Sequence, residues 1–594
     1  MKLSRISLAI VPLLSVFSVQ AAVYSVVEVG QVEELKSTYA AGINNAGDMV
    51  FNGAIKVTKF DPISNRQYTD FQLFDFPLDL SLIDFENEAI QSLFTEAELA
   101  DLLNGIVSAE SLKILLELNT ISVLQPIGDA ISYLKTTNAD AENILLRDSQ
   151  AKRGNSEYLL AINDAGIAAG FASSTFIYQS FTPAPTDDVP EPEALNYWVP
   201  TLPYSSAVVF NNNTVTTLSA PYTELGGGFS VARNISSDNR IAGYGSSGMG
   251  EASFEAITTS CNGATLPVDL CLYRNAISGS YQQRALVWQL QSDGSVNAPQ
   301  VYGYLGDKNT GEAFEGVGIN NITYYSQANA VNNKGIAVGI SMFSDSDRIN
   351  RYIFGNGYAD GIYRQAHASI FVGDQVLPIV DPKEWFIIPG NIGNNVAGSV
   401  AIDINDNNIV VGYANKFINS NASSKMFVHD YASGETNFPT GFFTSSSTIP
   451  NAINNMNQVV GNAEVIIGGT TTRRKHGFVY DIASSSFTDL NSLIGCNTPY
   501  TIVDAVDIND HGVITATALM KRESRDLLGE PVLDSAGNPV LEDVSTVLQL
   551  QPIANGEAED CNAADAVYER QGGAVSFAWL LAGAGLLWRR RFSR

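Results

Sequence analysis

The stretch AINDAGIAAG, Ala161–Gly170, contains an asparagine, a glycine three residues later and a second glycine four residues after that. Asparagine is favoured at the first position of a type I turn. Glycine tolerates the positive φ that ends a three-residue hairpin loop. The stretch therefore predicts a tight β-hairpin, and we asked whether it is one copy of a repeated unit.

Six further segments share this pattern. The seven turns open with Asn44, Asn163, Ser236, Asn332, Asn405, Asn454 and Asn509. Three residues later every copy has the glycine or asparagine that positive φ requires, at Gly47, Gly166, Asn239, Gly335, Asn408, Asn457 and Gly512. Five copies place another glycine in the following strand, which is typical of a close backbone approach, at Gly170, Gly243, Gly339, Gly412 and Gly461.

An apolar third strand follows most of the hairpins, and a fourth strand often follows the third. The predicted third strands are 207–210, 284–288, 367–371, 425–428, 476–480 and 547–550. Two spacings between copies, 49 and 55 residues, are close to the length of a propeller blade, and the longer spacings indicate insertions. We predict an all-β fold over residues 22–553, a seven-bladed β-propeller of four-stranded antiparallel blades. Segment 24–29 would complete the last blade; a linear β-solenoid, the alternative, requires more regular spacing.

The first blade contains the longest insertion, about 80–148, and a small part of it is predicted to be helical. Thr95 and Glu98 match a capping box, and Ser108 is a candidate cap for a second helix. Such a helical hairpin either packs its apolar side on the propeller or serves as a lid or docking element. A second irregular stretch, Pro183–Pro203, is predicted to be a surface loop.

Charge and cysteine content narrow the environment of the chain. The 594 residues have a formal net charge of −28, which disfavours nucleic acid as a partner because phosphates would be repelled. The four cysteines, in a chain that is predicted to be exported, suggest disulfides. Three pairings are open, and we favour the most local one, Cys261–Cys271 with Cys496–Cys561. The alternative is that the thiols are buried and unpaired.

Both ends of the chain look like targeting segments. Residues 1–21 have the charged, apolar and small-residue parts of a signal peptide, with cleavage expected between Ala21 and Ala22. An acidic linker, 554–571, precedes a tail at 572–594. That tail consists of Gly572 and Gly573, an apolar run of 15 residues and the basic cluster of Arg589, Arg590 and Arg591. A run of this length is marginal for spanning a membrane, and a permanent anchor is the alternative to processing.

Two resemblances follow from these motifs. His367-Ala368 and His476-Gly477-Phe478 resemble the third strand of the HAF-repeat family of exported bacterial proteins, and the likeness covers Tyr24 to about Ile553. That family has no established activity. The tail closely resembles the GlyGly-CTERM sorting signal, which implies cleavage near Gly572-Gly573 by a rhomboid-type sorting protease, rhombosortase. It also implies passage through the inner membrane of a Gram-negative bacterium and delivery by secretion machinery to the cell surface or the medium.

No catalytic signature stands out, and we predict no catalytic residue. The four histidines fit structural roles better than catalysis. Asp403 and Asp507 begin oxygen-rich loops, but the twelfth positions are Ala414 and Ala518, where an EF-hand needs glutamate. Calcium is therefore a weak candidate and the sole cofactor that the sequence leaves open.

The leading hypothesis is a secreted or cell-surface binding or structural module that presents its loops to a glycan or protein. The alternative is an extracellular hydrolase or lyase that acts on polysaccharide through carboxylates around the propeller channel. Propellers host both classes, so the predicted fold does not decide between them.

Overall fold

The computed structural model describes residues 23–558, apart from gaps at 33–34, 55, 58–59, 62–65, 68–72, 75–79, 81–82, 119–125, 127, 129, 148–153, 280, 307–323, 345–348, 355–356, 363–365, 382–397, 419–420, 467–471 and 526–530. The predicted signal peptide with Ala21 and Ala22, the distal linker with Cys561, and the tail with Gly572, Gly573, Arg589, Arg590 and Arg591 lie outside the described residues.

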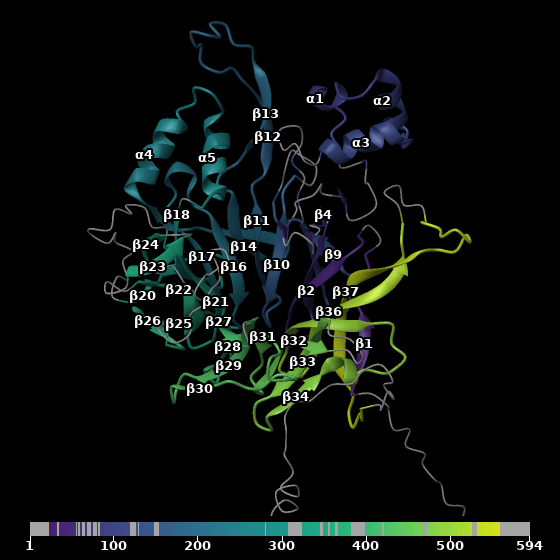
Figure 1. Ribbon diagram of the computed structural model, residues 1–594, viewed down its shortest axis with the longest axis vertical. Helices are drawn as coiled ribbons and strands as arrows, with labels where there is room; N and C mark the ends of the chain where they lie inside the picture. Colours follow the sequence, from purple (N-terminus) through teal and green to yellow (C-terminus); the bar gives the residue numbers. More distant parts are fainter. Residues whose placement is uncertain are drawn as a thin grey trace, which may run out of the picture.

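The chain folds into seven four-stranded antiparallel sheets around a common axis, which confirms the predicted seven-bladed β-propeller (Figure 1). Blade 1 consists of β2 (Thr38–Ile43), β3 (Met49–Ala54), β8 (Ala130–Lys135) and β9 (Glu142–Ile144). Blade 2 consists of β10 (Glu157–Ile162), β11 (Ala168–Ser173), β14 (Ser205–Asn211) and β15 (Thr214–Leu218). Blade 3 consists of β16 (Ser230–Ile235), β17 (Arg240–Met249), β18 (Tyr281–Gln289) and β19 (Gln300–Val301). Blade 4 consists of β21 (Ser326–Val331), β22 (Ala337–Ser344), β25 (Ala366–Val372) and β26 (Gln375–Pro378), and the short strand β20 (Leu305–Gly306) lies beside β22. Blade 5 consists of β27 (Ser399–Ile404), β28 (Ile409–Ile418), β29 (Asn421–Asp430) and β30 (Glu435–Asn437). Blade 6 consists of β31 (Thr448–Ile453), β32 (Gln458–Ile466), β33 (Arg473–Asp481) and β34 (Ser486–Asp489). Blade 7 consists of β35 (Thr501–Ile508), β36 (Ile514–Glu523), β37 (Leu541–Pro552) and β1 (Tyr24–Glu28).

The N-terminal strand closes the ring, as predicted. β1 pairs antiparallel with β37, so the two ends of the propeller share blade 7. Glu28 reinforces this closure because its carboxylate accepts bonds from Arg522 Nη2 at 2.8 Å, Thr546 Oγ1 at 2.9 Å and Tyr500 OH at 3.1 Å. Buried clusters of aliphatic and aromatic side chains then join each blade to its neighbours.

The repeated turns have the conformation that their residues predict. All seven residues at the fourth turn position have positive φ, from 61° at Asn457 to 84° at Gly47. The five strand glycines lie where each inner strand bulges toward the second strand. A Cβ at Gly170 would overlap the carbonyl oxygen of Tyr158, and the other four glycines face the same obstacle. Glycine is therefore required there by backbone approach.

The asparagine that opens each turn makes bonds within its own turn and to the next blade. In blade 2 the Oδ1 atom of Asn163 accepts from the backbone N–H groups of Ala165 and Ile167. Its Nδ2 atom donates to the carbonyl oxygen of Ser236 in blade 3 at 3.1 Å. Six of the seven turns make this second bond, and the last of them joins Asn509 to the carbonyl of Asn44 in blade 1 at 2.9 Å. We call these bonds the asparagine ring.

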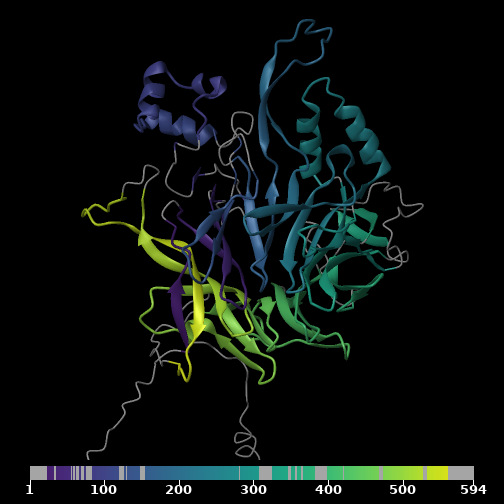
Figure 2. The ribbon, with the colours of Figure 1, turned by 180° about the vertical axis from the view of Figure 1, so that it is seen from behind.

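The strand order gives the propeller two distinct faces. The turn face carries the seven hairpin turns, and the opposite insertion face carries every connection between a second and a third strand. Figures 1 and 2 both show helices α1 (Glu88–Gln91), α2 (Glu96–Leu103) and α3 (Ala109–Leu118) projecting on the same side as α4 (Glu251–Ser260), α5 (Val268–Ile277) and the β12–β13 hairpin (Phe176–Phe181 and Leu195–Pro200).

The insertions agree only in part with the sequence expectations. The Thr95 capping box is present, and Ser108 Oγ accepts from the N–H of Ser111 at the start of α3. Two expectations need correction. The range 80–148 is too long, because 130–144 forms the third and fourth strands of blade 1, and Pro183–Pro203 contains β13. Helices α4 and α5 were not predicted.

Asn509→Asp tests the asparagine ring with little change of shape. Aspartate keeps the acceptor for the turn, but it loses the donor and places a carboxylate against the buried carbonyl of Asn44. We expect a loss of about 1–3 kcal/mol in the free energy of unfolding, measured by urea denaturation at pH 8. Asn212→Asp, in an exposed turn, is the control; an equal effect of both substitutions would contradict the role of the ring.

Candidate functional site: the central channel

Two cavities lie along the propeller axis. The one at the turn face has a volume of about 170 Å³, and all seven aliphatic residues that precede the turns line it. The other, which we call the mouth, has a volume of about 770 Å³ and lies nearer the insertion face. Three polar residues border both cavities, and we call them the neck: Asn234, Asp403 and Asp507.

The neck residues occupy the same place in blades 3, 5 and 7, two residues before the turn. Asp403 Oδ2 accepts from the N–H of Ile453 in the next blade at 2.9 Å, and Asp507 Oδ2 accepts from the N–H of Ile43 at 2.9 Å. Asn234 Oδ1 makes the equivalent, longer contact of 3.4 Å. Blades 1, 2, 4 and 6 have small residues here, which leave room for the longer side chains: Gly42, Ala161, Ala330 and Ala452.

Burial makes the neck aspartates weak acids. The pKa of Asp403 is raised to about 7, mainly by desolvation and further by the charge of Asp507. The pKa of Asp507 is raised to about 6, again mainly by desolvation. Both side chains keep some accessible surface where they line the channel, and protein surrounds them on the other sides, so their charged forms are poorly solvated. Their second oxygens accept from the N–H groups of Ile404 and Ile508 at 2.8 Å.

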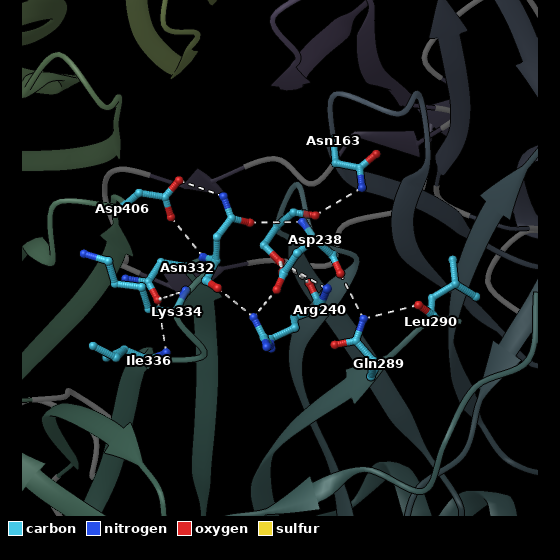
Figure 3. A network of polar contacts seen from close by, with 11 residues as sticks. Asn163, Asp238, Arg240, Gln289, Leu290, Asn332, Lys334, Ile336 and Asp406 are labelled. Carbon is cyan, nitrogen blue, oxygen red and sulfur yellow. Dashed lines mark hydrogen bonds and ion pairs between the residues drawn. The ribbon is translucent and has the colours of Figure 1, made fainter. Parts of the chain in front are cut away.

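A second set of polar contacts joins the turns at the turn face. Asp164, Asp406 and Asp510 each receive bonds from the asparagine side chains of neighbouring turns. Between blades 3 and 4, Ser236 replaces the ring asparagine. Arg240 bridges this junction by donating to Asp238 and, at 2.9 Å, to the carbonyl of Asn333 (Figure 3). The carboxylates of Asp164, Asp406 and Asp510 therefore connect the turns of neighbouring blades.

The mouth has a different chemistry. Seven side chains, each three residues before a turn, surround it: Ala41, Leu160, Arg233, Asn329, Ile402, Asn451 and Val506. Further lining comes from Tyr39, Tyr413, Gln327, Asn462, Lys475 and Asp504. Asp504 Oδ1 accepts from the amides of Asn451 at 2.6 Å and Asn462 at 2.9 Å, and burial raises its pKa. The mouth thus combines amides, phenols, two cations and three carboxyl groups whose pKa values are raised by burial.

The cysteines and histidines singled out in the sequence are absent from the described lining of this channel, whereas Asp403 and Asp507 belong to it. Cys261 and Cys271 form the predicted disulfide, which joins α4 to α5. Cys496 is also disulfide-bonded, but Cys561 lies outside the described residues, so that pairing stays a prediction. His429 and His476 bond Thr436 and Asp489 within their own blades. None of the four histidines is among the described residues that line either cavity.

The calcium expectation rested on Asp403 and Asp507, whose oxygens the structure uses as acceptors for backbone N–H groups. Among the described residues, no group of three or more His, Cys, Asp and Glu side chains is arranged to hold a metal ion. Within the same part of the chain, every helix is too short or too polar to cross a bilayer. Arg233 and the neck were not identified from the sequence, although aspartate two residues before a turn in two copies was a usable signal.

The neck gives stability a defined pH dependence. Unfolded aspartate ionises near pH ~3.9, whereas Asp403 and Asp507 keep their protons to about pH 7 and 6. The folded state binds more protons in this interval, so their contribution is greatest below pH ~4 and is lost as pH rises to ~7. We expect the free energy of unfolding of Asp403→Asn, relative to that of the parent, to increase by on the order of 2 kcal/mol as pH rises from 4 to 8. Thermal and urea unfolding measure this difference.

Asp430→Asn is the matched control for this titration. The pKa of Asp430 is lowered, first by the N–H of Ala432. Its contribution to stability therefore changes only below pH ~4, and between pH 4 and 8 the difference between Asp430→Asn and the parent should be flat. A flat difference between Asp403→Asn and the parent across this pH range would show that the neck carboxyl is not a raised-pKa group.

Comparisons with known proteins identify a family. Among solved structures, the chain is similar to the crystal structure of polysaccharide lyase Uly1, with 11% identity, a TM-score of 0.33, and coverage of 72% of this chain and 85% of that one. It is also similar to the crystal structure of the tricorn protease, with 9% identity, a TM-score of 0.27, and coverage of 66% and 34%. No curated protein matches the sequence. A family model described as a protein of unknown function, DUF3466, matches residues 1–591. The chain therefore belongs to the DUF3466 family.

Proposed function

We propose that this protein is an exported binding module that takes a glycan in the mouth of its propeller channel. The supporting observation is the lining of the mouth, a cavity of about 770 Å³ with amide, phenol and charged groups around it. Amides and carboxylates match the hydroxyl groups of sugars as hydrogen-bond partners. Tyr39, with 42% of its surface exposed, offers a ring on which a sugar can stack.

Binding is favoured over hydrolysis by how the acids of the channel are used. Each oxygen of Asp403 and Asp507 accepts a backbone N–H, so these carboxylates join blades. Asp504 Oδ1 is likewise occupied, since it accepts from the amides of Asn451 and Asn462. Paired carboxylates with a gap for water or substrate are the usual requirement for glycoside hydrolysis.

The positions of the chain ends suit a protein that is held by its tail. Tyr24 pairs with Pro552 at the turn face, where β37 ends and β1 begins. Segments that follow Pro552 therefore leave from the face opposite the mouth. If the tail passes through the inner membrane as proposed, the insertion face and the mouth point away from the bilayer.

We also propose that the signal peptide is removed at Ala21–Ala22 and the tail near Gly572-Gly573. Replacing both glycines by leucine strengthens the helix and removes the backbone exposure that an intramembrane protease needs. Fractionation of a Gram-negative host with a rhomboid-type sorting protease should show the parent released and the Gly572→Leu/Gly573→Leu chain retained in the inner membrane. Equal release of both chains would contradict the sorting proposal. Gly248→Leu is the control, because an added Cβ there would meet its nearest described neighbour, Gln282 Oε1, only at 3.7 Å.

Glycan-array binding of the full chain, followed by calorimetry with the best ligand, tests the proposed function. We expect Tyr39→Ala to weaken binding about tenfold, since an aromatic contact contributes ~0.5–1.5 kcal/mol beyond its area. Tyr39→Phe should retain most of the affinity because the ring remains. A chain that binds nothing on the array would defeat the proposal, and cleavage of a bound polysaccharide would favour the enzyme alternative.

A further inference from the structure

We infer that the mouth selects an acidic glycan, whose carboxylate or sulfate group binds Arg233. This inference rests on the proposed glycan-binding function and names its ligand class. The observation behind it is that Arg233 is exposed, lines the mouth, and makes no hydrogen bond or ion pair with any part of the chain that the structure describes.

Among the described residues, Arg233 lacks the carboxylate partner that several other arginines of this chain have. With a formal net charge of −28, carboxylates are plentiful, and other arginines have found them. Arg240 pairs with Asp238, Arg473 with Glu464, and Arg522 with Glu28. The guanidinium of Arg233 keeps all of its donors available on the wall of a cavity. A planar fork of this kind fits a carboxylate or sulfate through two parallel bonds.

The place of Arg233 in the repeat argues against a purely structural role. Among the seven residues three positions before a turn, the two asparagines join blades. Asn329 donates to the carbonyl of Ala401 at 2.8 Å, and Asn451 donates to the carbonyl of Ala505 at 2.8 Å. Arg233 occupies the equivalent position in blade 3 and makes no such bond. It is also the sole charged residue of this set of seven, whose other members are small, aliphatic or amide side chains.

Lys475 supplies a second positive charge to the mouth. It lies on β33 of blade 6, is exposed, and has no ion pair within 4.0 Å among the described residues. Its charge acts on Asp504, whose Oδ1 atom is already bound by two amides. An anionic ligand would therefore meet two cations and several neutral donors, in a cavity whose lining also contains the carboxyl groups of Asp403, Asp504 and Asp507. Gln327 and the asparagine amides would bind its hydroxyl groups.

The test compares acidic and neutral probes on the full chain by calorimetry. The probes are an oligogalacturonate, a sulfated galactan oligosaccharide and a neutral galactan oligosaccharide. We expect one acidic probe to bind at least tenfold more tightly than the neutral one. Arg233→Gln should remove that preference, with a loss of ten- to a hundredfold for the acidic probe and little change for the neutral one. The carboxylated and sulfated probes separate the two sources of negative charge.

Two further variants sharpen the result. Arg474→Gln is the matched control. Arg474 is an exposed neighbour of Lys475, it has no ion pair in the part of the chain that the structure describes, and it is not among the described residues that line the mouth. Its replacement should leave binding unchanged. Arg233→Lys keeps the charge without the fork, so an intermediate affinity is expected. Unchanged Tm values would show that each variant is folded.

The outcomes separate the inference from the proposed function. Tight binding of the neutral probe, with no preference for either acidic one, would overturn the inference and leave glycan binding in place. Equal loss in Arg233→Gln and Arg474→Gln would also overturn it. Failure of all three probes, together with an empty glycan array, would overturn the proposed function on which the inference rests.

Discussion

The amide of a turn asparagine joins six of the seven blades to the next one, and the propeller depends on this bond. The Oδ1 atom of the side chain shapes its own hairpin, and the Nδ2 atom donates to a buried carbonyl one blade further on. A residue with only an acceptor, or only a hydroxyl, cannot do both. The six bonds run in one direction around the axis, and the bond from Asn509 returns to Asn44, so blade 7 is joined to blade 1 both by this bond and through β1.

The exception in blade 3 helps to explain the rest. Ser236 satisfies its own turn but does not reach blade 4, and Arg240 and Asp238 bridge the gap through Asn333. Deeper in the channel, the neck residues repeat the same strategy with backbone N–H groups as donors. Most polar side chains at the turn face and in the neck thus serve the joints. The mouth differs, because Arg233 and Lys475 serve none that the described residues show.

The sequence predicted the parts of this fold that depend on local backbone chemistry. Turn asparagines, positive-φ residues and close-approach glycines mark each hairpin, so the number of blades followed from them. The third strand of blade 1 at Ala130–Lys135 was missed because a long insertion separates it from its hairpin. The prolines around Leu195–Pro200 predict a loop, but this stretch forms a strand that pairs with β12.

The candidate site could not be predicted in the same way. The sequence suggested Asp403 and Asp507 as weak calcium candidates. The bond that each makes to the following blade forms only when the two blades pack together in the folded chain. That Arg233 has no partner among the described residues is likewise a property of the folded chain, since the other residues of the mouth come from blades distant in sequence. The most direct measurement is a crystal structure of the full chain with an acidic oligosaccharide. We expect the anionic group within hydrogen-bond distance of the Arg233 guanidinium, whereas a ligand bound at the turn face or on the insertion helices, with an empty mouth, would contradict this assignment.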